Sequence, residues 1–168
     1  MEYELKSISK SGIAEAIAKV KHYRYLNEPE EAESICRDIL AIDPQHQLAL
    51  RLLGLAITDQ FIGASPDRYR EVEETFQKLT ERYERLYYTG ILYERRAKVQ
   101  LRSGHLPHTV LPLFGRAMDC FGEAEKIRPA GNDDAILRWN RCVRLLHAPG
   151  YAWEEEFVSF DPQDMPPA

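Results

Sequence analysis

Apolar residues recur along most of the chain at steps of three and four, the spacing that places them on one face of a helix. Between Gly12 and Pro29 the positions that follow this spacing are Ile13, Ala16, Ile17, Val20 and Tyr23. No segment alternates apolar and polar residues over a useful length, as a half-buried strand would. The pattern therefore predicts an all-α protein.

Proline and glycine divide this pattern into seven predicted helices. Pro29 and Pro66 suit the first turn of a helix, where the missing N–H has no intrahelical partner, and Asp43-Pro44 ends a helix because the residue before proline disfavours the α region. Residues 105–112 contain two prolines and are predicted to form a loop. The predicted helices span roughly residues 13–28, 29–43, 47–61, 66–79, 83–103, 113–127 and 132–147.

Composition and charge define one helical body and a tail. The 168 residues are 44% hydrophobic and 29% charged, which fits a single globular domain, assigned to residues 1–150. Residues 151–168 hold five acidic and no basic residues, so the chain's net charge of −5 resides in this acidic, aromatic tail. The acidic balance argues against a nucleic-acid partner, and no apolar run is long enough to cross a membrane.

The chain's location is predicted from its cysteines and its N-terminus. Cys36, Cys120 and Cys142 are an odd number with no close pair, which favours free thiols in a reducing compartment. The N-terminus lacks the basic-then-apolar pattern of a secretory signal. We therefore expect a cytoplasmic protein.

The helical segments repeat with a period near 34 residues. Residues 13–46 fill one such unit, and the later segments repeat its small and aromatic positions. The repeated positions are Tyr23, Ala32, Leu40 and Asp43-Pro44, then Leu53-Gly54 and Phe76-Gln77-Lys78, then Ala117, Phe121, Ala124 and Pro129. On these residues the chain resembles the tetratricopeptide repeat family over about residues 10–147.

The resemblance implies an α-α superhelix of about three helix hairpins, at residues 13–46, 47–82 and 83–129, closed by a capping helix at 132–147. The first helix of the third unit can be aligned on either Gly90 or Ala97. The side chains expected in the core or between repeats are Tyr23, Leu52, Leu55, Phe76, Phe121 and Trp139.

The resemblance also implies a concave groove that holds peptides or partner helices. The partner-binding positions that it carries over are Lys21, Arg24, Tyr25, Arg51, Leu55, Lys98, Arg102, Asn140 and Arg144. The groove positions of the family also include Thr58, Asp59 and Glu94. Six bases against two acids would make the groove locally positive, so an acidic segment is the expected partner. The alternative is a self-associating module whose groove is filled by its own acidic tail or by a second copy.

A catalytic role is the competing interpretation of the sequence. The chain has no Gly-rich phosphate loop and no nucleophile elbow. His105 and His108 are three residues apart but lie in the predicted proline loop, so we expect exposed loop histidines there and not a metal site. The arginines between Arg85 and Arg102 are interpreted as surface residues whose aliphatic side-chain atoms lie over apolar surface. The prediction is a binding protein, not an enzyme, with no cofactor and no metal.

Overall fold

The computed structural model describes residues 3–151 and 153, and every regular element among them is helical. A short 3-10 turn, η1 (Lys10–Gly12), precedes the first α-helix. The seven α-helices of the described chain are α1 (Ile13–Tyr25), α2 (Pro29–Ile42), α3 (Gln47–Asp59), α4 (Pro66–Gln77), α5 (Arg82–Arg102), α6 (Pro107–Lys126) and α7 (Asp134–Leu146). This confirms the all-α prediction and its seven helices.

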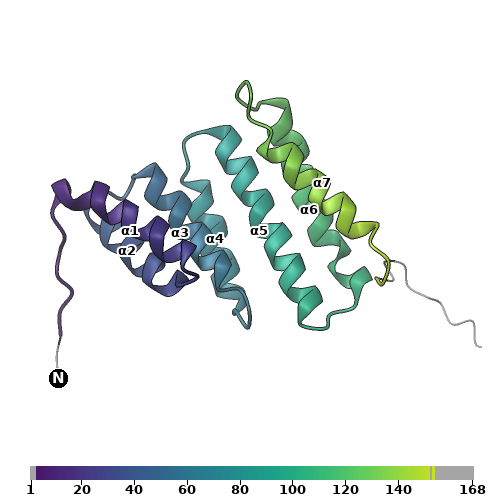
Figure 1. Cartoon of the computed structure of the whole chain (residues 1–168), viewed down its shortest axis with the longest axis horizontal. Helices are drawn as coiled ribbons and strands as arrows, with labels where there is room; N and C mark the ends of the chain where they lie inside the picture. The colour runs from purple at the N-terminus through teal and green to yellow at the C-terminus, as the bar shows by residue number, and fades with distance from the viewer. Residues whose placement is uncertain (1–2, 152, 154–168) are drawn as a thin grey trace, which may run out of the picture.

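The helices form an elongated array of antiparallel hairpins, with α1 and α7 at opposite ends (Figure 1). Each helix packs against the next one along the chain. The first helices of successive hairpins also touch, α1 against α3 and α3 against α5, as stacking of hairpins requires. The pairs α1/α2, α3/α4 and α5/α6 fall within the three predicted repeat units, and α7 is the closing helix.

The core consists of two hydrophobic clusters that meet at Tyr88. One is built on α1 to α4 and the other on α5 to α7, and Tyr88 packs against both. Its ring centroid lies 5.4 Å from that of Phe76 and 5.1 Å from that of Tyr87. The expected core residues Leu52, Phe76 and Phe121 are buried, while Tyr23, Leu55 and Trp139 are half-buried against a cluster.

Two glycines allow the closest approaches between paired helices. A Cβ on Gly54 would lie 2.2 Å from Cε1 of Phe76, and a Cβ on Gly90 would lie 2.5 Å from Cε1 of Phe121. Each glycine on a first helix thus receives the buried phenyl ring of the following helix. Gly90, and not Ala97, therefore occupies in the third hairpin the place that Gly54 has in the second.

The predicted loop at residues 105–112 is wrong, because α6 already begins at Pro107. Pro107 is at the first helical position, where it is tolerated, but Pro112 lies inside the helix. An interior proline costs about 3 kcal/mol. Val110 and Phe114 are fully buried on either side of it, and burying two such side chains contributes roughly as much or more. Tertiary packing therefore extends the helix through a residue that locally opposes it.

An ion-pair network joins α2 to α4 and includes Gln60 at the end of α3. The Glu33 carboxylate accepts hydrogen bonds from Arg68 (2.6 Å), Arg37 (2.6 Å) and the Gln60 amide (2.7 Å), and both arginines also pair with Glu71. The Glu33 side chain is only 13% exposed. Burial by itself raises the pKa of this carboxyl, but the three hydrogen bonds outweigh it and lower the pKa to about 2.

Stability is expected to fall as this carboxyl is protonated. A folded-state pKa of about 2 lies below the unfolded value near 4.5, so the contribution is present above about pH 5 and is lost as the pH falls toward 2. Glu33→Gln should reduce the free energy of unfolding at pH 7 by about 2 kcal/mol and flatten its decline between pH 5 and 2. Urea titrations at each pH measure this. Glu31→Gln, at an exposed position on the same helix, is the control, and equal pH profiles for the two variants would contradict the prediction.

Candidate functional site

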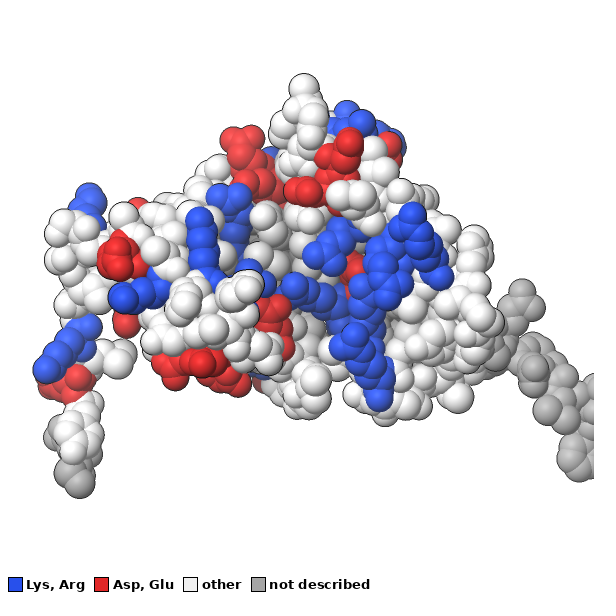
Figure 2. Space-filling view, viewed as in Figure 1, with Lys and Arg blue, Asp and Glu red and all other residues white. Residues whose placement is uncertain are grey.

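A basic hollow lies where α3, α5 and α7 come together on the side of the array formed by the first helices. Its volume is about 270 Å³. Figure 2 shows basic side chains gathered on this face over α5 and α7. We define the basic hollow by the residues that line it: Thr58, Asp59, Ile62, Arg95, Lys98, Val99, Arg102 and Arg138.

One wall of the basic hollow is fixed by contacts of Asp59. Its carboxylate accepts a hydrogen bond of 2.8 Å from Nε of Arg24 and a second from Arg95, so it joins α1, α3 and α5. Arg95 also donates to the Thr58 hydroxyl at 2.5 Å and to the carbonyl oxygen of Leu55 at 3.3 Å. The Arg95 guanidinium is therefore held in place before any ligand binds.

The opposite wall is organised around a buried carboxylate. The Glu94 side chain is fully buried and pairs with Lys98 on its own helix and with Nη1 of Arg138 on α7 at 3.4 Å. This pair links α7 to α5, although more than 30 residues separate the two helices along the chain. Arg102, in the last turn of α5, has no ion-pair partner among the described residues.

The hollow has an excess of positive charge. Four cations and one carboxylate line it, a net formal charge of +3, and adding the flanking Arg24 and Glu94 leaves that sum unchanged. The pKa of Arg95 is lowered, first by burial and then by repulsion from Arg24 and Arg138, against the attraction of Asp59. Such a surface attracts anionic groups and disfavours cationic ones.

Part of the predicted binding set is brought together here. Lys98 and Arg102 line the hollow, and Arg24 flanks it through Asp59. Thr58 and Asp59 also line the hollow, and Glu94 lies beneath its wall, where it pairs with Lys98. Leu55 is half-buried against the second core cluster and contributes its carbonyl oxygen.

The remaining predicted residues do not line the hollow. Arg51 is paired with Glu84 at 2.9 Å, which joins α3 to α5 and makes it a structural contact. Lys21 and Tyr25 are exposed on α1, with Tyr25 88% exposed, and Arg144 is exposed on α7. Asn140 is half-buried on α7. Lys21, Tyr25, Asn140 and Arg144 are therefore outside the cavity.

Four lining residues were absent from the predicted set: Ile62, Arg95, Val99 and Arg138. Arg95 precedes Lys98 by three residues, so helical spacing could have placed it on the same face. Arg138 could not be found in this way, because its place depends on how α7 packs against α5. Ile62 is 79% exposed in the turn after α3 and adds an apolar edge to a charged cavity.

All three cysteine thiols have raised pKa values. Burial raises the pKa of the Cys36 thiol to about 12 and that of Cys142 to about 11, so both stay protonated near neutral pH. Cys120 is half-buried, and burial raises its pKa to about 11. Within residues 3–151 and 153, no three His, Cys, Asp or Glu side chains are grouped so that they could hold a metal ion.

Two further predictions concern membranes and the tail. None of the helices in the described part of the chain is both long and apolar enough to cross a bilayer. The tail lies outside the described residues except for Tyr151 and Trp153. The Trp153 ring packs edge-on against Phe114 of α6, with centroids 5.8 Å apart, and so joins the second core cluster.

Comparison with known proteins adds no relative. No family model matches the chain, and no curated protein matches it.

Proposed function

We propose that the chain is a tetratricopeptide-like interaction module that binds an acidic segment of another protein in the basic hollow. The observation that carries this proposal is the hollow itself: a cavity of about 270 Å³ with three cations on α5, one on α7 and a single lining carboxylate. The repeated fit of Gly54 against Phe76 and of Gly90 against Phe121 supports the repeat assignment.

The arrangement suits an extended acidic segment better than a compact small molecule. The hollow is smaller than the roughly 300–1,000 Å³ of most small-molecule sites. Carboxylates presented along a chain could pair with Arg102 and Arg95 while an apolar side chain covers Ile62. Because most of the lining cations stay partly exposed, charge would contribute mainly to the association rate and to selectivity.

Arg102→Glu is the variant that tests this proposal. Lys98 is less suitable, because it pairs with buried Glu94 and its reversal would disturb the fold. Peptides selected from a random displayed library against the full chain should be enriched in Asp and Glu. Their affinity for Arg102→Glu should be at least roughly tenfold weaker at low salt, and wild-type affinity should fall as salt rises. Fluorescence anisotropy measures both.

Lys10→Glu is the matched control, since it makes the same charge change on η1, at the far end of the array. The selection should also be run on a chain that lacks residues 154–168, because an acidic tail in the hollow would compete with the library, and this deletion keeps Trp153 against Phe114. Peptides without acidic enrichment, or equal affinity for wild type and Arg102→Glu, would refute the proposal.

A further inference from the structure

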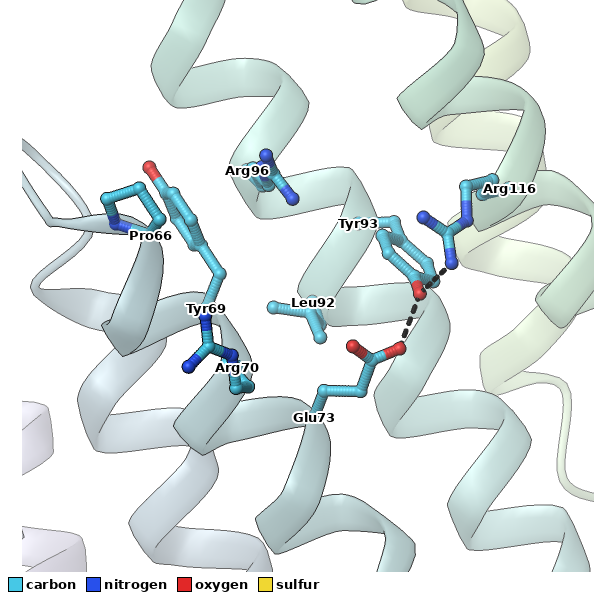
Figure 3. A pocket seen from close by; sticks show the side chains of 8 residues that line it. All are labelled: Pro66, Tyr69, Arg70, Glu73, Leu92, Tyr93, Arg96 and Arg116. Carbon is cyan, nitrogen blue, oxygen red and sulfur yellow. Dashed lines mark hydrogen bonds between the residues drawn. The ribbon is translucent and has the colours of Figure 1, made fainter.

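A second cavity opens on the opposite side of α5, between α4 and α6 (Figure 3). We call it the tyrosine–arginine notch and define it by Tyr69, Arg70, Glu73, Tyr93, Arg96 and Arg116. Its volume is about 180 Å³. This is below the roughly 300 Å³ at which small-molecule sites begin, so the notch has room for a single side chain.

Two arginines in the notch are held by aromatic rings. The Arg96 guanidinium carbon lies 4.5 Å from the ring centroid of Tyr69, and that of Arg116 lies 4.1 Å from the centroid of Tyr93. Neither arginine forms an ion pair with any residue that the structure describes. A ring face orients a guanidinium without neutralising it, so both keep their positive charge available.

The polar groups on the Arg116 side satisfy one another. Arg116 donates to the Tyr93 hydroxyl at 2.5 Å, and this hydroxyl donates to Oε1 of Glu73 at 2.7 Å (Figure 3). Arg96 takes no part in this chain. Its Nε is buried and has no hydrogen-bond partner among the described residues. Because this nitrogen is closed off from the cavity, a ligand can meet only the terminal nitrogens of Arg96, which form no hydrogen bond with any residue that the structure describes.

We propose that the tyrosine–arginine notch binds the carboxylate of one acidic side chain of a partner protein, through Arg96. A carboxylate can accept from both terminal nitrogens of one guanidinium at the same time. Its methylene groups would lie against Leu92 and the Tyr69 ring, which also line the cavity.

The charge of the notch favours a carboxylate over a phosphate. Arg70 also lines the cavity, but its charge is balanced by Asp67, which lies 3.3 Å away and outside the cavity. The remaining charged side chains are Arg96, Arg116 and Glu73, which together carry one net positive charge. A carboxylate neutralises one charge, whereas a phosphate monoester would add nearly two beside Glu73. The notch and the basic hollow lie on opposite sides of α5, so this site does not depend on the proposed function.

The test follows the arginine Nε–H resonances of the ¹⁵N-labelled full chain during titration with N-acetylglutamate N-methylamide. We expect a saturable shift of the Arg96 resonance with a dissociation constant in the millimolar range. Arg141, exposed on α7, should not shift in this way and serves as the internal control. A shift at Arg96 that is linear, or no larger than the shift at Arg141, would overturn the proposal. Tighter binding of inorganic phosphate than of the glutamate probe would overturn its assignment to a carboxylate.

Arg96→Lys supplies an independent comparison. Lysine keeps the positive charge beside Tyr69 but cannot form the two-point contact, so binding of the probe should weaken at least roughly tenfold, read from backbone amide shifts of α5. Unchanged affinity in this variant would contradict the role given to Arg96. The wild-type titration needs no variant, so the proposal stays testable even if Arg96→Lys unfolds.

Discussion

Replacing Glu94 with glutamine is expected to lower the free energy of unfolding by about 3 kcal/mol. The Glu94 carboxylate is fully buried between Lys98 and Arg138, whose side chains are 21% and 35% exposed. An uncharged amide would leave the Lys98 and Arg138 cations without a neutralising charge between them. Its NH₂ group would also face the N–H donors of one of these side chains. Because both can still reach solvent, the cost should lie at the lower end of the range for breaking buried pairs. Urea unfolding followed by circular dichroism measures it.

Glu125→Gln is the matched control for this prediction. Glu125 pairs with Arg128 at 3.4 Å on the surface, and its loss should cost less than about 0.5 kcal/mol. If Glu94→Gln is equally mild, the buried pair does not hold α7 in place. The same variant removes one negative charge beside the basic hollow, so its folded form should bind the selected acidic peptides more tightly than wild type does.

Gly54→Ala is expected to destabilise the protein by about 2 kcal/mol, although alanine is the better helix former. On helix propensity alone this change would stabilise α3 by up to about 1 kcal/mol. The added Cβ would lie 2.2, 2.5 and 2.9 Å from three ring carbons of Phe76, a fully buried residue without room to move aside. Overpacking of this kind costs about 1–3 kcal/mol and outweighs propensity. Chemical denaturation again gives the value.

Two further variants isolate the steric cause. Gly115 is also helical, in α6, but a Cβ there would meet nothing within 4 Å, so Gly115→Ala should stabilise by about 0.5–1 kcal/mol. Combining Gly54→Ala with Phe76→Leu, which removes the clashing ring atoms, should cost less than the sum of the single changes. The steric account fails if Gly54→Ala and Gly115→Ala have the same sign, or if the double variant is additive.

The positions of six of the seven helices could be predicted closely from apolar spacing and from proline and glycine. These signals are local: Pro29 and Pro66 open α2 and α4 as expected. The start of α6 could not be predicted, because Pro112 by itself indicates a loop, whereas the helix continues through it. Only the burial of Val110 and Phe114 against the rest of the array overrides it.

The candidate site was predicted in part. Residues one helical turn apart share a face, so Lys98 and Arg102 could be assigned to the same surface of α5, and both line the basic hollow. The roles of Arg51, paired with Glu84, and of Arg138, paired with Glu94, depend on which helix lies opposite. Spacing along one helix carries no information about its neighbour's rotation or offset.

The sequence by itself determined the helical class, the order and approximate length of the helices, and the small positions at which neighbours approach closely, because these follow from the periodicity and conformational limits of short segments. Only the tertiary structure decided that Gly90 receives Phe121, that Glu94 is buried between two cations, and that arginines on opposite sides of α5 open into two separate cavities. Each of these depends on the rotation and offset of one helix against another, which are determined by the packing of side chains distant in sequence.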